Sequence, residues 1–174
     1  MLVEVALIQR FQLLLGQPVL SFTLVLGVLL LGGGLGSLAS GRVRLERLAA
    51  VISWVGLSVG GLVLLYLLAL PAIVKLIMPA SLLVRSLAIV ALVLPLGFVM
   101  GMPFPSGLRL AQRVHPRDIP LLWGVNGVFS VLGSVLAVVI AMGWGFSRAL
   151  ALGAACYLGL FVLTAWMARK NRRG

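Results

Sequence analysis

The chain has 174 residues, of which 62% are hydrophobic and only 10% are charged, and its mean hydropathy is +1.22. A water-soluble domain is about half apolar and a quarter charged, so this chain lacks the polar residues to cover a water-facing surface. The composition disfavours a soluble enzyme, a DNA-binding domain and a disulfide-rich secreted module. Its 14 lysines and arginines outnumber 3 acidic residues and lie mostly in short gaps between apolar runs, which indicates a polytopic membrane protein.

The apolar runs predict an all-α bundle of six membrane-crossing helices that form a single integral membrane domain over residues 1–174. At about 20 residues per span, six spans take about 120 residues and leave the remainder for loops. The predicted spans are 2–16 (short for a span), 18–39, 48–70, 86–104, 119–143 and 148–168. Pro71 and the run Met102-Pro103-Phe104-Pro105 are expected to end the third and fourth spans, and Pro95 to bend the fourth. The stretches 71–85 and 106–118 are accordingly predicted to be loops.

The positive charges predict the side of the membrane on which each loop lies. Loops 41–47 and 106–118 and the tail 169–173 share one side in a six-span topology, and together they carry ten lysines and arginines. The three on the opposite side are Lys75, Arg85 and Arg148. Because cytoplasmic loops are enriched in Lys and Arg, the first set is expected in the cytoplasm of a bacterial-type inner membrane, with both termini on that side.

Small residues at helical spacing predict close contacts between helices. The run Gly34-Leu-Gly-Ser-Leu-Ala39 matches the dinucleotide-binding pattern G-x-G-x-x-A. That pattern needs a preceding strand and an acid about 20 residues further on, and neither is present, so no nucleotide cofactor is predicted. A spacing of four residues instead places Gly32 with Gly36, and Gly97 with Gly101, on faces where helix backbones approach closely.

The fifth predicted span has one small, polar face. The residues on it follow at intervals of four, three, four and four: Asn126, Ser130, Gly133, Ala137 and Ala141. An asparagine inside a membrane is costly unless it is hydrogen-bonded, so Asn126 is expected to face protein or a wet cavity. Hydrogen bonding between helices is the first interpretation for Asn126 and Ser130, and substrate contact is the second. The second span is the expected neighbour of this face.

Glu4, Gln9 and Arg10 form the most polar group within the apolar runs. Glu4 and Arg10 are six residues apart, which is about 120° around a helix and about 9 Å along it. This spacing is not that of an i,i+4 pair, so each side chain requires a partner from another helix or from water. Two interpretations stay open for Glu4: a functional acid within the membrane, or a solvated residue at its inner interface.

The remaining reactive residues form no catalytic or metal-binding group. His115 lies in a basic loop without a second His, a Cys or a pair of carboxylates beside it, so it is predicted to be solvated. Cys156 is the single cysteine and lies in an apolar run, which predicts a buried, inert thiol. We therefore expect no metal, no cofactor and no enzymatic activity from this chain by itself.

Several strings resemble the C-terminal membrane module of multi-pass proteins related to spermidine synthase. They cover nearly the whole chain and are Glu4–Phe11, Leu15–Pro18, Gly34–Ser37, Gly101–Arg109, Trp123–Gly127 and Ser130–Ser134. The strings that begin Gly101-Met-Pro-Phe-Pro and Trp123-Gly-Val-Asn-Gly are the more specific ones. In that family the module accompanies a soluble domain of aminopropyltransferase or methyltransferase type, and some members are fused to half of a major facilitator. This chain carries no such soluble domain, so the resemblance does not imply synthase activity.

The resemblance implies a membrane module that anchors a soluble synthase-like partner or passes a small polar or cationic metabolite to or from it. In the family the first helix continues upstream with further apolar residues, which would place Glu4 within the membrane. Half a major facilitator fold, with three plus three inverted helices, also fits six spans, and Leu-Gly-Ser recurs at 35–37 and 132–134 in the spans that such a repeat pairs. Two alternatives stay open: an accessory subunit of a larger membrane complex, and a half-size transporter that works as a homo-oligomer. The lipid bilayer is a partner in every case and nucleic acid in none.

Overall fold

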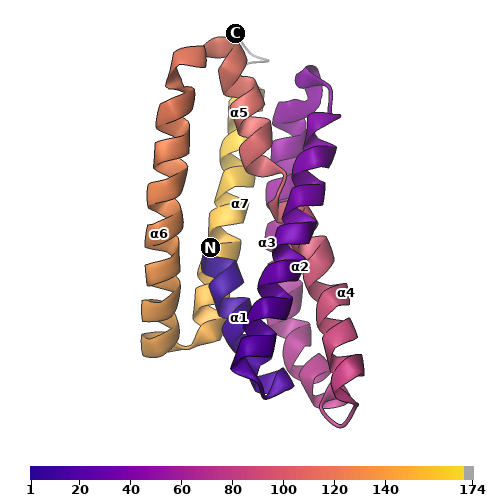
Figure 1. The fold of residues 1–174 in the computed structure, drawn as a ribbon. Coiled ribbons are helices and arrows are strands. Elements are labelled where there is room, and N and C mark those ends of the chain that lie inside the picture. The colour runs from indigo at the N-terminus through magenta and orange to yellow at the C-terminus, as the bar shows by residue number, and fades with distance from the viewer. Residues whose placement is uncertain (171–174) are drawn as a thin grey trace.

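The structure is a computed structural model that describes residues 1–170, with side chains as far as Met167, and this part of the chain is helical with short connections (Figure 1). The α-helices are α1 (Leu2–Leu15), α2 (Pro18–Gly41), α3 (Leu48–Ile77), α4 (Leu82–Met100), α5 (Pro103–Val114), α6 (Ile119–Trp144) and α7 (Phe146–Lys170). Two short 3₁₀ helices, η1 (Leu45–Arg47) and η2 (Pro116–Asp118), lead into α3 and α6. The basic tail expected at 169–173 lies outside the residues whose side chains the structure describes.

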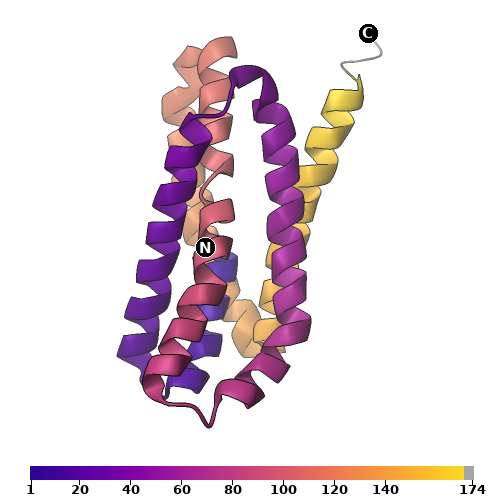
Figure 2. The same cartoon turned by 90° about the vertical axis from the view of Figure 1, so that its right-hand side faces the viewer.

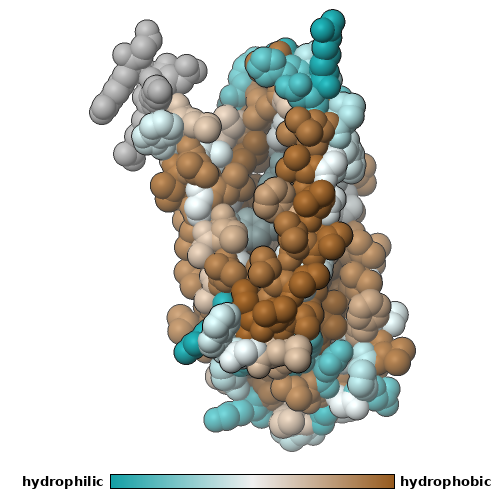
Figure 3. Space-filling model, turned by 90° about the vertical axis from the view of Figure 1, so that its left-hand side faces the viewer, coloured by the Kyte–Doolittle hydropathy of each residue, from teal (hydrophilic) through white to brown (hydrophobic). Residues whose placement is uncertain are grey.

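Five helical segments of the described chain are long and apolar enough to cross a membrane. They are Pro18–Gly41, Leu45–Ile77, Leu82–Val114, Pro116–Trp144 and Phe146–Met167. Large apolar side chains cover the outer surface of the bundle, and Figure 3 shows them as a broad brown band between two hydrophilic ends. Backbone groups paired within helices and an apolar outer surface are what a lipid environment requires, so the chain folds as a helical membrane bundle.

The connections between the long helices gather at the two ends of the bundle (Figures 1 and 2). Residues 42–47, residues 113–118 and the C-terminal end of α7 lie at one end, which we call the basic end. The turns at 16–17, 78–81 and 145 lie at the other, which we call the opposite end.

The tightest packing lies between α3 and α7 and between α2 and α4. Large side chains that are fully buried in the shared core come from several helices: Leu7, Phe11, Val59, Ile89 and Leu150. Helix α6 is the least covered, because only Ala137 and Ala141 are buried along it. It contacts α1, α7 and α5 and so stands at the side of the bundle, as the left of Figure 1 shows.

Helix α1 differs from the first predicted span. Its 14 residues extend about 21 Å, which is shorter than the roughly 30 Å of a bilayer's hydrocarbon core. Both ribbon views place the N-terminus halfway along the bundle, not at the basic end where the sequence predicts it (Figures 1 and 2). The first helix therefore occupies only the half of the bundle next to the opposite end.

Two predictions made from prolines are wrong. Pro71 does not end the third span, because α3 continues through it to Ile77, as proline can within membrane helices when neighbouring groups satisfy the freed carbonyl. The stretch 106–118 is not a loop, because Pro103 begins α5 in the first helical turn, where no backbone N–H is needed. The fourth span is interrupted at 101–102, next to the predicted Met102-Pro103-Phe104-Pro105 break, and Pro95 lies inside α4 as expected.

Candidate functional site

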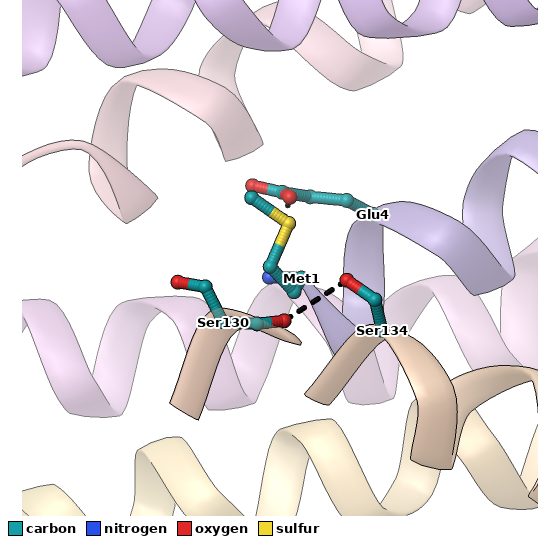
Figure 4. A network of polar contacts seen from close by, with 4 residues as sticks. All are labelled: Met1, Glu4, Ser130 and Ser134. Carbon is teal, nitrogen blue, oxygen red and sulfur yellow. Dashed lines mark hydrogen bonds and ion pairs between the residues drawn. The ribbon is translucent and has the colours of Figure 1, made fainter. Parts of the chain in front are cut away.

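Glu4 lies in the first turn of α1, next to the N-terminus in the middle of the bundle. Its carboxylate forms an ion pair with the Met1 ammonium at 3.2 Å (Figure 4). This is the only ion pair recorded within the described residues. The Glu4 side chain is 23% exposed, so it borders open space and is not sealed in the core. The Glu4 carboxylate thus has a polar neighbour within its own first helical turn.

A small cavity, which we call the Glu4 hollow, lies between α1, α2 and α4 and has a volume of about 210 Å³. Met1 and Glu4 form one side of it, and glycines of the two other helices border it: Gly33, Gly34, Gly97 and Gly101. The remaining wall is apolar and consists of Leu26, Leu29, Leu30 and Met100. The hollow thus places a carboxylate against an otherwise apolar surface.

Glycines of α2 and α4 form the close contact between these two helices. A Cβ atom added at Gly36 would overlap the Phe98 carbonyl, and one added at Gly101 would overlap the Gly33 carbonyl. At Gly32 the added atom would lie 2.7 Å from the Leu94 carbonyl oxygen. Side chains at these positions would force the two backbones apart, so α2 and α4 meet only because they carry glycine there.

The polar face of α6 turns toward the bundle. Asn126 and Ser130 line a cavity of about 550 Å³ between α1, α6 and α7, which we call the α6 hollow. A Cβ added at Gly133 would lie 3.5 Å from the Met1 Cβ, and Ala137 is fully buried. The prediction that this face contacts the second span is wrong. The face lies against α1 and α7, whereas α2 packs mainly on α4 through its glycines.

Asn126 lies between two cavities. Besides the α6 hollow it lines a cavity of about 630 Å³ between α5, α6 and α7, together with Phe129 and Thr164. Its side chain is exposed, and no hydrogen bond from it is recorded within the described residues. Cys156 on α7 is exposed and lines the α6 hollow, so the prediction of a buried thiol is wrong. The cavity between α6 and α7 leaves this part of α7 uncovered.

Gln9 and Arg10 do not join Glu4 in one site. The Arg10 guanidinium donates to the Ser147 hydroxyl at 3.3 Å, close to the turn between α6 and α7 at the opposite end. The Gln9 Oε1 atom is buried without a hydrogen-bond donor. Of the three sequence candidates, Glu4 is the one that borders the cavity between α1, α2 and α4.

The basic end carries a contact that the sequence analysis missed. Arg109 on α5 donates to the backbone carbonyls of Ser40 and Val43, the latter at 3.0 Å, and so ties α5 to the end of α2. Around it lie exposed cations: Arg42, Arg44, Arg47, Arg113 and Arg117. The signal for this contact is the spacing of Arg109 and Arg113, four residues apart on one side of a helix, which favours an amphipathic helix over a loop.

No family model, curated protein or solved structure matches this chain. Similarity to the membrane module of spermidine-synthase-related proteins therefore stays a prediction from the quoted strings. Within the part of the chain that the structure describes, no three His, Cys, Asp or Glu side chains gather in a way that would hold a metal ion. The features left to argue from are the basic end and the cavities beside Glu4 and Asn126.

Proposed function

We propose that this chain is a non-catalytic membrane module that holds a soluble, spermidine-synthase-like protein at the cytoplasmic face of a bacterial-type inner membrane. The observation that carries the proposal is the set of exposed arginines at the basic end of a bundle whose surface between its two ends is apolar. Positive loops mark the cytoplasmic side of membrane proteins. A dense positive surface on that side also attracts and orients an acidic surface of a soluble partner.

The tie between α5 and α2 supports docking at this end. Because Arg109 holds two carbonyls at the end of α2, the arginines that follow α2 and those on α5 keep a fixed relative position. A preorganised charged surface loses less conformational entropy on binding than charges on free loops. The basic end therefore offers a defined docking surface as well as a topology signal.

The same proposal includes the half-facilitator architecture of three plus three inverted helices. In such a repeat the first span is structurally equivalent to the fourth, and the second to the fifth. Arg109, at the end of the fourth, contacts the end of α2, and Arg10, near the end of α1, contacts Ser147 just beyond α6. The packing of α2 on α4 likewise corresponds to that of α6 on α1. These paired contacts support the repeat.

Docking at the basic end is tested by charge removal at two ends of the molecule. The membrane protein is purified from native membranes, and the amount of a co-purifying soluble protein of aminopropyltransferase or methyltransferase type is measured. The double variant Arg113→Gln with Arg117→Gln is expected to recover only a small fraction of that soluble protein. The matched double variant Lys75→Gln with Arg148→Gln removes two cations near the opposite end. It is expected to retain the soluble protein. Raising the salt concentration should release the protein, because exposed charge pairs are screened over about 8–10 Å at physiological ionic strength.

The orientation of both variants is checked in the same membranes, since removing loop charges can alter topology. Equal recovery of the soluble protein with the two double variants contradicts docking through the basic end. Recovery of membrane subunits alone, with no protein of that soluble class, contradicts the proposed partner.

A further inference from the structure

Asn126 lies in the apolar helix α6, and its side chain has no hydrogen-bond partner among the described residues. A carboxamide within a membrane is costly unless its N–H groups and its carbonyl oxygen are hydrogen-bonded. Asn126 lines the cavity of about 630 Å³ between α5, α6 and α7, which we call the α5 hollow. Leu122 and Phe129, four residues before and three residues after it, line the same cavity. Asn126 therefore lies on the side of α6 that faces the α5 hollow.

The rest of the wall of the α5 hollow is almost entirely apolar. The described residues that line it include no charged side chain and one other polar residue, Thr164 on α7. The Thr164 hydroxyl donates to the Leu160 carbonyl at 2.8 Å and accepts the Ser53 hydroxyl at 2.7 Å. Since Thr164 is already paired within the protein, the Asn126 carboxamide is the polar group that the α5 hollow offers to a ligand.

The α5 hollow is open to molecules dissolved in the bilayer. Asn126 is exposed, and Phe129 beside it is 68% exposed, so the cavity reaches the apolar outer surface of the bundle. Its volume lies within the range of roughly 300–1,000 Å³ that is typical of small-molecule sites, which are mostly apolar with a few polar groups. Helix α1 contributes no residue to its wall.

The wall restricts the chemical class of the ligand. An ionised group would find no counter-charge in the α5 hollow, and a hydrocarbon would leave the Asn126 carboxamide unpaired. A hydroxyl group both donates and accepts a hydrogen bond, so it pairs with either end of the carboxamide. We infer that the α5 hollow binds an uncharged, largely apolar alcohol whose hydroxyl group is hydrogen-bonded to Asn126. This inference does not depend on docking at the basic end.

The inference is tested by photolabelling the full chain in lipid nanodiscs with a diazirine analogue of 1-octanol. Mass spectrometry locates the label, which is expected on the wall of the α5 hollow, at Leu108 and Leu160. Excess 1-octanol should reduce this labelling about fivefold more than the same membrane concentration of n-octane does, because the alcohol alone gains the hydrogen bond to Asn126. Equal competition by the alcohol and the alkane overturns the inference.

A substitution at Asn126 tests the role of its carboxamide. Asn126→Leu replaces the carboxamide with an apolar side chain of similar size, so the label should still enter the α5 hollow but 1-octanol should compete no better than n-octane. Ser130→Ala is the control, because it removes a hydroxyl one turn further along α6 that does not line the α5 hollow. This variant should keep the preference for the alcohol. A preference that survives in Asn126→Leu overturns the inference. Far-UV circular dichroism and gel filtration of each variant establish that the bundle is intact.

A pair of glycine substitutions tests the cavity without altering Asn126. Gly107 lines the α5 hollow, and a Cβ there meets no atom within 4 Å, so Gly107→Leu fills the space without displacing backbone. Gly127 on α6 is equally open but does not line the hollow, so Gly127→Leu is the matched control. Gly107→Leu is expected to reduce labelling at Leu160 at least fivefold relative to Gly127→Leu. Equal labelling of these two variants overturns the site, whereas equal recovery of the soluble protein by the two double charge variants overturns only docking at the basic end.

Discussion

Gly36 and Gly34 lie two residues apart on α2, yet the structure gives them opposite tolerance for a side chain. A Cβ at Gly36 overlaps the Phe98 carbonyl across the contact with α4, while one at Gly34 meets nothing within 4 Å. We expect Gly36→Ala to lower the free energy of unfolding by about 1–3 kcal/mol or more, because backbone atoms must move. Gly34→Ala should leave stability unchanged or raise it by up to about 1 kcal/mol through helix propensity.

Thermal unfolding of both variants in the same detergent measures this difference. If the two alanine variants unfold at the same temperature, α2 and α4 do not meet at Gly36. The comparison is internal, because both substitutions add one methyl group to the same helix in the same membrane environment.

The glycine and Asn126 faces show what residue spacing can and cannot predict. A spacing of four residues correctly groups side chains on one side of a helix, and Gly32 and Gly36 do lie together against α4. Spacing carries no information about which helix covers that side, so the contact predicted between the Asn126 face and the second span is wrong. Its neighbours depend on where α1 and α7 lie, which is a property of the assembled bundle.

At the scale of elements, α5 is the segment whose role depends most on a single side chain. Arg109 holds the Ser40 and Val43 carbonyls at the end of α2. Removing it in Arg109→Ala leaves those carbonyls without this charged donor, which costs about 1.5 kcal/mol for a partly exposed pair. Hydrogen exchange of the backbone amides at 42–47 should become several-fold faster. Arg113→Ala, on the same helix but exposed, should leave that exchange unchanged.

The prolines explain why the limits of the elements were harder to predict than their helical nature. Pro71 and Pro95 lie within helices, whereas Pro103 begins one. Each proline removes one donor and clashes with the preceding turn, but a membrane helix continues through it where neighbouring groups satisfy the freed carbonyl. The local sequence signal, a proline in an apolar run, is the same in all three cases. Only the surrounding helices decide whether the helix continues through the proline or is interrupted there.

At the scale of the whole molecule, composition alone predicts the membrane bundle, because too few polar residues are present to form a water-facing surface. The candidate site at Glu4 is predictable in part: an acid in an apolar run requires a partner, but the sequence does not show that Met1 supplies it. The hollow beside Glu4 was not predictable. It lies where the first turn of α1 meets α2 and α4, and these segments come together only after folding.

The orientation of the molecule in the membrane can be tested by thiol labelling at exposed positions of its two ends. Ser40 is fully buried, so a cysteine there would report burial, whereas Gln112 at the basic end and Ser81 at the opposite end are both exposed. In a Cys156→Ser background, a cysteine at Gln112 should resist a membrane-impermeant thiol reagent in intact cells, and one at Ser81 should react. Both should react after the membrane is permeabilised, which controls for accessibility. Because six arginines of the described chain lie at the basic end, the reverse labelling pattern would place that charge outside the cell and would remove the basis for docking a cytoplasmic partner there.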